Sequence, residues 1–325
     1  MIRNPNDIRD GEKKIRMLIA GYPGIGKSTL ALSAPNPLHI DVDFGIDRIE
    51  PRYRKSYIQP RSYDEILEDL TPINVQGFDT LVFDTGGKLI SLMSLWAIKK
   101  DPKNAKKDGS LAIQGYGCVK REFNRLMDFC FYELQKNIVI VFHAKEDKDG
   151  DVTRLRIKVE GSTKEDVWEP MDLGGFVEMY GNDRTIGFSN CERYFAKGTR
   201  GISGIHRIPA LTPTSPNDFL TKLFAEYNAI SAKEAERSAA EQEAYEAAMS
   251  EGHSIIATIV DADTANIAIP KIKAIKYALT SKKELGVELN AKIEACGLFY
   301  DKVLKKYTPK PESDPREQKA QGGGA

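Results

Sequence analysis

The stretch KIRMLIAGYPGIGKSTLAL, residues 14–32, decides the fold of this chain. Its apolar beginning, residues 17–20, predicts a buried strand, and residues 29–32 are compatible with a helix. Between them, residues 21–28 have the spacing G-x-x-x-x-G-K-S, in the strand–loop–helix order that a phosphate-binding loop requires. The sequence therefore predicts a P-loop, which holds the phosphates of a nucleotide.

Each residue type in this loop has a physical purpose. The glycines let backbone N–H groups turn inward without a Cβ in the way. Lys27 places a positive charge beside the β- and γ-phosphates, and the Ser28 hydroxyl is a ligand for Mg²⁺. The following helix presents the positive end of its dipole to the anion. We expect ATP and Mg²⁺ as cofactors, with the nucleotide held by Gly21, Tyr22, Pro23, Gly24, Ile25, Gly26, Lys27, Ser28 and Thr29.

Composition indicates a soluble globular protein. The chain has 325 residues, of which 41% are apolar and 29% charged, and its formal net charge is zero. Any affinity for nucleic acid must therefore come from local patches. The four cysteines form no C-x-x-C pair, which favours reduced thiols over a disulfide frame or a zinc site. With no signal-peptide pattern and no apolar run of membrane-spanning length, we expect a cytoplasmic protein that has no membrane partner.

Strand and helix patterns alternate through the first half of the chain. Strands are expected from Pro37, at 57–60, at 78–85 and at 137–143, and helices at 63–70, 88–98 and 116–135. The continuous apolar run at 137–143 is typical of a strand buried on both faces of a parallel sheet. Short strands follow at 152–159, 176–179, 184–188 and 193–196, the first with strict polar–apolar alternation. We expect an α/β fold, with a mostly parallel sheet and antiparallel hairpins at its edge.

Helical patterns dominate the remainder. Helices are expected at 217–228 and 231–250, with two or three more within 253–308, where Pro270 would lie in a first turn and Gly286 would break a helix. The polar tail is expected to be disordered. The predicted organisation is a lead at 1–13, a P-loop domain at 14–228, a helical C-terminal region at 229–308 and a tail at 309–325. That C-terminal region is either a docking module or a packing cap.

Acidic residues follow two of the apolar strands. Asp84 ends the strand at 78–85, where a P-loop protein needs a carboxylate for Mg²⁺. Asp41 and Asp43 leave the strand that begins at Pro37, and we prefer Asp43 as the base that activates water. His143 ends the next apolar strand and is placed to sense the γ-phosphate.

Several segments resemble, in order, the core of the RecA-type ATPases. These are residues 40–47, Gln59–Pro60 before a helix, 81–85, Tyr116–Gly117, His143, Asp172 and 196–200. More specifically, the chain is similar to phage ATP-binding proteins related to RecA that act in single-strand annealing and recombination. The resemblance covers about residues 14–228 and implies a RecA-like P-loop ATPase of AAA type. RecA-type enzymes usually have glutamate where this chain has Asp43, so weak or DNA-dependent turnover is expected.

The resemblance also implies catalysis between subunits. Lys197 and Arg200 resemble the paired cations that RecA-like ATPases project into a neighbouring nucleotide site, although their spacing is one residue longer. A homo-oligomer is therefore expected, with Arg200 acting in trans and Lys197 assisting.

Two basic segments fall where RecA-like folds hold DNA. The first is a lysine-rich loop, containing Lys99, Lys100, Lys103, Lys106 and Lys107. The second is an alternating strand, with Arg154, Arg156 and Lys158 on one face. Cations near phosphate release counterions, and Tyr116 and Trp168 are available to stack bases. We expect single-stranded DNA as a ligand, and a single-strand-binding protein or another replication or recombination protein as a partner.

Two alternatives remain open at this stage. One is a different motor ATPase, such as a helicase loader. The other is a nucleotide-gated binding protein whose assembly is controlled by ATP and whose turnover is negligible.

Overall fold

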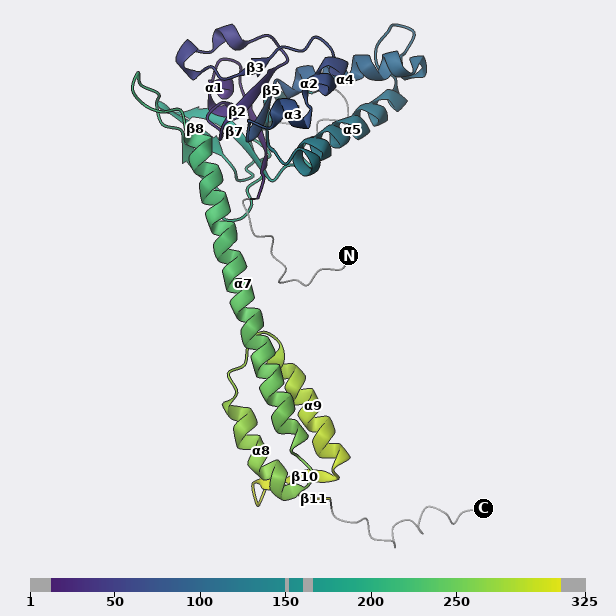
Figure 1. The fold of residues 1–325 in the computed structure, drawn as a ribbon, viewed down its shortest axis with the longest axis vertical. Helices are drawn as coiled ribbons and strands as arrows, with labels where there is room; N and C mark the ends of the chain where they lie inside the picture. Colours follow the sequence, from purple (N-terminus) through teal and green to yellow (C-terminus); the bar gives the residue numbers. More distant parts are fainter. Residues whose placement is uncertain (1–12, 150–151, 160–165, 311–325) are drawn as a thin grey trace. The chain divides into compact units, whose positions relative to one another are not determined.

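The computed structural model describes residues 13–149, 152–159 and 166–310 (Figure 1). The chain divides into two compact units, one spanning Gly11–Ser231 and the other beginning at Ala232. The expected disordered tail falls outside the described residues except for its first two positions. Within the described ranges, no helix is both long enough and apolar enough to cross a membrane.

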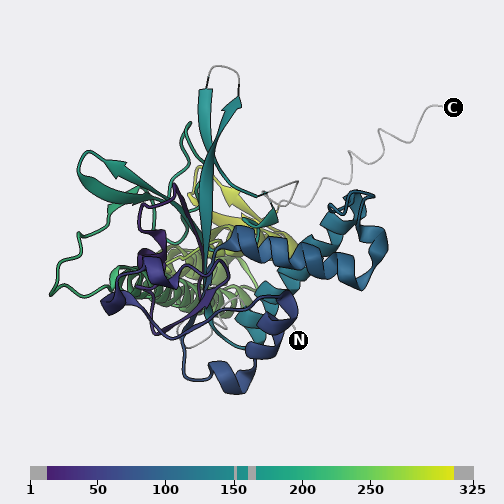
Figure 2. The same ribbon diagram turned by 90° about the horizontal axis from the view of Figure 1, so that it is seen from above.

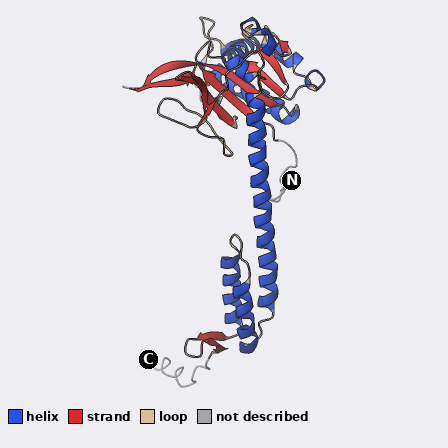
Figure 3. Cartoon of the chain, turned by 90° about the vertical axis from the view of Figure 1, so that its left-hand side faces the viewer, coloured by secondary structure: helices blue, strands red, loops and turns tan. Residues whose placement is uncertain are grey.

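A mixed sheet in the order β3–β2–β4–β5–β1–β7–β8–β9 forms the centre of the first unit (Figure 1, Figure 3). Neighbouring strands from β3 to β7 run parallel, whereas β8 and β9 are antiparallel at one edge and β6 pairs antiparallel with the end of β5. The strands are β1 (Arg16–Gly21), β2 (Pro37–Asp41), β3 (Tyr57–Ile58), β4 (Thr80–Asp84), β5 (Asn137–Asp149), β6 (Val152–Ile157), β7 (Leu173–Tyr180), β8 (Asp183–Gly187) and β9 (Ile205–Arg207). The predicted α/β class, with a mostly parallel sheet and antiparallel edge strands, is confirmed.

Helices cover both faces of this sheet. Leu18 and Ala20 of β1 belong to an apolar cluster with α2, α4 and α5, whereas Met17 and Ile19 belong to a second cluster with α1 and the first turns of α7. The elements are α1 (Lys27–Ala31), η1 (Ile46–Arg48), η2 (Pro51–Tyr53), α2 (Tyr63–Asp69), α3 (Pro72–Val75), α4 (Gly86–Lys100), η3 (Pro102–Asn104), α5 (Ile113–Asp128), η4 (Phe129–Glu133) and α7 (Phe219–Ala257). Alternate residues of a strand point to opposite faces, so the sheet is buried between two helical layers.

Strands β5 and β6 continue beyond the sheet as a two-stranded arm, formed by Ala144 onward in β5 together with β6 (Figure 2). Leu155 and Ile157 are buried, whereas Arg154 and Arg156 on the opposite face are partly exposed, so the alternation of the sequence matches a half-exposed strand. In the same view, α4 and α5 extend to another side of the sheet.

Two sequence expectations for the first unit and its boundary are wrong. The strand expected at 193–196 is absent, because only isolated bridges form at Tyr194 and Lys197 and the N–H of Ala196 donates to Asn190 Oδ1 at 2.7 Å instead. The helices expected at 217–228 and 231–250 are one helix, α7. No glycine or proline separates them, and the backbone continues through Ser231.

The second unit contains the end of α7, α8 (Ala262–Ala274), α9 (Ser281–Ala295) and a hairpin of β10 (Leu298–Asp301) and β11 (Lys306–Pro309). The helical C-terminal region is confirmed, with three corrections. Pro270 lies inside α8, because the capping box of Asp261 and Thr264 starts that helix earlier. Gly286 lies inside α9 and does not break it. Residues 298–308, inside the range where further helices were expected, form most of the hairpin instead.

Candidate nucleotide-binding site

The carboxyl ends of three central strands meet at one edge of the sheet. Gly21 at the end of β1 lies beside His143 of β5, and Asp84 at the end of β4 lies beside Val141 of the same strand. Open α/β sheets bind ligands at this edge. The sheet order therefore brings the loop, the strand-ending aspartate and the histidine together, although they are up to 122 positions apart in the sequence.

Backbone conformation explains the glycines of the loop. Gly24 and Gly26 have φ of 79° and 83°, in the left-handed region that favours glycine. The segment from Gly21 to Thr29 has the strand–loop–helix form that the sequence predicts, although α1 has only five residues. The residues expected to hold the nucleotide extend from the last residue of β1 through the loop into the first turn of α1.

Lys27 is the buried cation of the site, only 4% exposed. Its Nζ donates to the backbone oxygen of Tyr22 at 2.7 Å and lies 3.4 Å from Nδ1 of His143. Burial lowers the pKa of Lys27 to about 8, although the negative charges of Asp84 and Asp43 oppose this shift. A charge held out of water in this way gains strongly from an anionic ligand.

His143 is kept neutral by its surroundings. Burial lowers its pKa, and the nearby charge of Lys27 lowers it further. The neutral ring can accept a hydrogen bond from the Lys27 ammonium through Nδ1. If Lys27 moved toward a phosphate, His143 would lose this contact with the ammonium.

Asp84 is a buried carboxylate suited to a cation. It is 4% exposed, and its Oδ2 lies 3.7 Å from Nε2 of His39. Among the residues that the structure describes, neither ring nitrogen of His39 has a hydrogen-bond partner. No group of three or more metal-ligating side chains occurs among the described residues. Mg²⁺ needs no such cage, since it takes one or two carboxylates together with substrate phosphates and water. Asp84 and the Ser28 hydroxyl fit this donor set.

The two aspartates that follow β2 have different surroundings. Asp41 is fully buried and accepts from the backbone N–H groups of Gly45 and Ile46 at 2.8 and 2.9 Å, and from the Gln59 amide at 2.8 Å. Asp43 has a side chain that is 25% exposed, and its Oδ2 lies 3.4 Å from Arg48. Burial raises the pKa of Asp43, and the charge of Asp84 raises it further. Asp41 therefore stabilises the segment at Gly45 and Ile46, which follows β2. Asp43 is the carboxylate whose pKa responds to the charge of Asp84.

The arm contacts the phosphate-binding loop. The Tyr22 hydroxyl donates to Glu146 Oε1 at 2.6 Å. The backbone N–H of Lys158 donates to the His143 carbonyl at 2.7 Å, and the Lys158 charge contributes to the lowered pKa of His143. Glu146 of the arm and Lys158, which directly follows β6, thus reach the nucleotide site.

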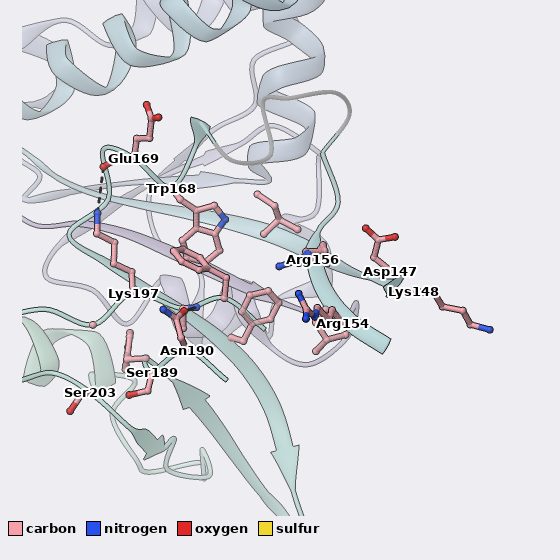
Figure 4. A pocket seen from close by; sticks show the side chains of 17 residues that line it. Asp147, Lys148, Arg154, Arg156, Trp168, Glu169, Ser189, Asn190, Lys197 and Ser203 are labelled. Carbon is pink, nitrogen blue, oxygen red and sulfur yellow. Dashed lines mark hydrogen bonds between the residues drawn. The ribbon is translucent and has the colours of Figure 1, made fainter. Parts of the chain in front are cut away.

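A cavity of about 950 Å³ lies between the arm and the segment that follows β8 (Figure 4). The aromatic side chains of Trp168, Phe176, Phe188 and Phe195 line it, together with the cations Lys148, Arg154, Arg156 and Lys197. The ring of Trp168 stacks with Phe176 at 6.4 Å and meets Phe195 edge-on at 5.0 Å. Arg154 and Arg156, expected to contact DNA, therefore lie in one aromatic and basic cavity.

The remaining predicted residues lie elsewhere. Lys197 lines the cavity, and its Nζ donates to the Glu169 carbonyl at 3.4 Å. Arg200 donates to Ser231 Oγ at 3.3 Å, and its guanidinium lies 5.9 Å from the Tyr227 ring centre, against α7. Lys99 and Lys100, expected in the lysine-rich loop, are instead the last two residues of α4, a 15-residue helix that begins two residues after Asp84, and the rest of the loop follows them. At 1.5 Å per residue that end is roughly 20 Å along the helix from Asp84.

Sequence reasoning missed four residues of this edge: His39, Gln59 as a partner of Asp41, Glu146 and Arg184. No local pattern distinguishes them. His39 is one of several polar residues near a strand end, and Glu146 lies in a segment of mixed charge. Arg184 on β8 packs against Gly26. A Cβ added to that glycine would lie 2.2 Å from Arg184 Nη1.

Comparisons with known proteins fit this site. Curated proteins give no match. Among solved structures, the flagellar accessory protein FlaH from Methanocaldococcus jannaschii is similar at 14% identity and a TM-score of 0.32, over 60% of this chain and 90% of FlaH. The model of the AAA domain family matches residues 13–200, which include the phosphate-binding loop, Asp43, Asp84 and His143, and the chain therefore belongs to the AAA domain family of nucleotide-binding proteins.

Proposed function

We propose that this chain is a RecA-like ATPase that binds ATP·Mg²⁺ and single-stranded DNA in phage-type recombination, annealing or replication. The observation that carries the nucleotide part is the convergence of Lys27, Asp84 and His143 at one sheet edge. A desolvated lysine beside a glycine turn suits phosphate, and a buried carboxylate beside it suits a divalent cation.

Each side chain has a role in the proposed reaction. Lys27 leaves the Tyr22 carbonyl and neutralises charge on the β- and γ-phosphates. Asp84 and Ser28 hold Mg²⁺, which when bound neutralises the charge that develops on the phosphate oxygens. Asp43, with its raised pKa, accepts the proton of the attacking water. His143 senses the γ-phosphate through the position of Lys27.

The proposal for DNA rests on the arm and its cavity. Single strands are held by cations that follow the backbone and by aromatic rings on which bases stack. Arg154, Arg156 and Trp168 supply both groups within one cavity. The lysine-rich loop lies at the far end of α4, so it would contact a separate part of the strand. The contacts of Tyr22 with Glu146 and of His143 with Lys158 provide a route from nucleotide to DNA.

Two other functions are compatible with the same nucleotide site. A helicase loader would need a protein partner before it hydrolyses ATP. A nucleotide-gated binding protein would bind ATP and assemble without turnover. As partners, we propose further copies of this chain and a single-strand-binding, replication or recombination protein.

Phosphate release with and without single-stranded DNA distinguishes these functions. We expect slow basal turnover that DNA stimulates, with no turnover in a Lys27→Ala control. Turnover that requires an added protein instead of DNA would favour the loader. Nucleotide-dependent assembly with no phosphate release under any condition would favour the gated binding protein. Failure of the wild-type protein to bind any nucleotide would exclude all three.

A further inference from the structure

Arg184 is an isolated cation at the flank of the phosphate-binding loop. It lies at the start of β8, which pairs antiparallel with β7, and β7 pairs parallel with β1. Gly21 is beside Val177, Val177 is beside Ile186, and Arg184 is opposite Met179. Because β8 begins where β7 ends, its first residues reach the sheet edge that carries the loop.

The guanidinium fills the space beside Gly26. At φ 83° this glycine adopts a left-handed conformation, and a Cβ there would lie 2.2 Å from Arg184 Nη1, so the arginine would have to move. The backbone conformation requires glycine before Lys27, and the close approach of Nη1 shows that the guanidinium lies directly against this turn. Close packing of a cation against a phosphate-binding turn is otherwise unfavourable, since the exposed N–H groups of such a turn carry partial positive charge.

No acid in the described part of the chain pairs with Arg184. Within the described ranges its side chain makes no hydrogen bond or ion pair, and its neighbour Asp183 pairs instead with Arg207 at 2.6 Å. Burial alone accounts for the lowered pKa of Arg184, with no carboxylate opposing it. A partly buried guanidinium without an anion is costly, and it gains when an anionic ligand arrives.

The position of Arg184 relative to the other charged groups defines which part of a ligand it meets. In the order β4–β5–β1–β7–β8, Asp84 and His143 lie on one side of the loop strand and Arg184 lies on the other. Asp84 is the proposed Mg²⁺ ligand and so marks the γ-phosphate end of the nucleotide. The opposite flank then faces the end of the phosphate chain that joins the ribose.

We infer that Arg184 binds the phosphate chain of the nucleotide on the flank opposite Asp84, as a cation supplied by the same chain. This inference rests on the proposed function, because it requires the loop to hold a nucleotide. The planar fork of arginine matches two phosphate oxygens at once. Since it acts near the ribose end, the contact serves ATP and ADP equally, unlike the contact proposed for His143.

The test compares nucleotide binding by Arg184→Met with that of the wild type. Methionine fills the same space without charge. We expect a loss of affinity for both ATP and ADP of about tenfold to a hundredfold, as for a hydrogen bond to a charged group. Inorganic triphosphate should lose affinity in parallel. Arg207→Met is the matched control, because Arg207 is a nearby cation that is 73% exposed and paired with Asp183, and it should bind as the wild type does.

Thermal stability gives a second readout, which a purely structural role would not move in this way. Without nucleotide, Arg184→Met should melt at the same or a higher temperature than the wild type, because a desolvated charge has been removed. The increase in melting temperature on adding ADP should be smaller than in the wild type. If the methionine variant does not fold, Arg184→Gln gives the same test with a polar, uncharged side chain.

Two results would overturn the inference. If Arg184→Met binds ATP and ADP as tightly as the wild type while Lys27→Ala does not, Arg184 does not contact the nucleotide and the proposed function stands. If its affinity falls for nucleotides but not for inorganic triphosphate, the contact is with the nucleoside and not with phosphate. A wild-type protein that binds no nucleotide would instead remove the proposed function and this inference together.

Discussion

The Nζ of Lys27 lies 3.4 Å from Nδ1 of His143, a residue 116 positions away in the sequence. His143 lies within β5 beside Gly21, the last residue of β1, and Lys27 begins α1 after the loop that follows β1. Burial lowers the pKa of both residues. This pair places a neutral acceptor beside the one ammonium that the phosphate-binding loop requires. The charge of Lys27 is thus held in position before any nucleotide arrives.

Substitutions of Lys27 and Asp84 should have different effects on nucleotide binding and hydrolysis. Lys27→Ala deletes the charge that faces the β- and γ-phosphates, and we expect most ATP binding to be lost. Asp84→Asn keeps the shape of the side chain and should retain much of the affinity, yet lose Mg²⁺-dependent hydrolysis. Nucleotide titration and phosphate release on both variants measure these effects. Wild-type hydrolysis by the Lys27 variant would exclude the role assigned to the loop.

The pKa of Lys27 predicts a pH dependence of nucleotide binding. Phosphates stabilise the charged form, so binding takes up a proton once the free protein has lost it above about pH 8. Affinity should fall as pH rises above this value, by at most about tenfold per unit. Titrations between pH 7 and 10 measure it. An affinity that is constant over this range would show that Lys27 stays charged in the free protein.

The lowered pKa of Lys27 also makes the stability of the free protein depend on pH, but stability rises with pH where nucleotide affinity falls. Because the folded pKa is depressed from 10.5 to about 8, the unfolded chain holds more protons between these values, and stability rises with pH there. The Lys27→Met variant removes the buried charge. It should be more stable than the wild type at pH 7, and this advantage should shrink between pH 8 and 10.5. Equal unfolding free energies at pH 7 would contradict the cost assigned to burial.

The salt dependence of DNA binding tests each of the two basic regions. Replacing Lys103, Lys106 and Lys107 with alanine should weaken single-stranded DNA binding for all sequences. It should also flatten the slope of log K against log salt, by roughly 0.7 for each phosphate that is no longer neutralised. Replacing Arg154 and Arg156 should do the same and also reduce base stacking in the cavity. The matched control removes three exposed lysines elsewhere: Lys55, Lys222 and Lys233. A slope equal to that of the control would identify the lysine-rich loop as a solvated surface.

The proposed role of Arg200 in a neighbouring subunit requires it to leave Ser231 and Tyr227. Arg200→Ala should bind ATP normally and hydrolyse it poorly, because a trans-acting guanidinium contributes on the order of 10³-fold or more. Mixing it with Lys27→Ala should restore some activity, since such neighbours pair an intact loop with an intact Arg200. A mixture that assembles normally but stays inactive would leave Arg200 with only its contacts to α7.

Two glycines of the second unit form a matched pair. Gly286 lies inside α9 and Gly297 follows that helix, and a Cβ would meet nothing within 4 Å at either position. Gly297 has φ of 65°, whereas Gly286 is helical. Gly286→Ala should therefore stabilise the unit by about 0.5–1 kcal/mol, and Gly297→Ala should destabilise it by about 1–2 kcal/mol. Chemical denaturation followed by circular dichroism measures both, and effects of the same sign would contradict this explanation.

The sequence by itself determined the features that depend on residues close together in the chain. The phosphate-binding loop, the aspartate that ends β4, the doubly buried β5 and the alternating β6 all follow from local spacing and hydrophobic period, because the physical constraints act within a few residues. The same local rules failed where a longer-range partner decides. Neither the absence of a strand at 193–196 nor the hairpin after Leu298 is visible in the hydrophobic period.

Only the tertiary structure decided which side chains share the nucleotide site. His39, Glu146 and Arg184 reach it because the sheet order places β2, β5 and β8 at particular distances from β1, and that order depends on burial over the whole unit. Asp41 accepts backbone hydrogen bonds and so has a structural role. The lysine-rich loop lies far from the site because α4, which precedes it, is 15 residues long. Spacing along the chain contains no information about such neighbours, since contacts between distant segments arise from packing and not from local conformational preference.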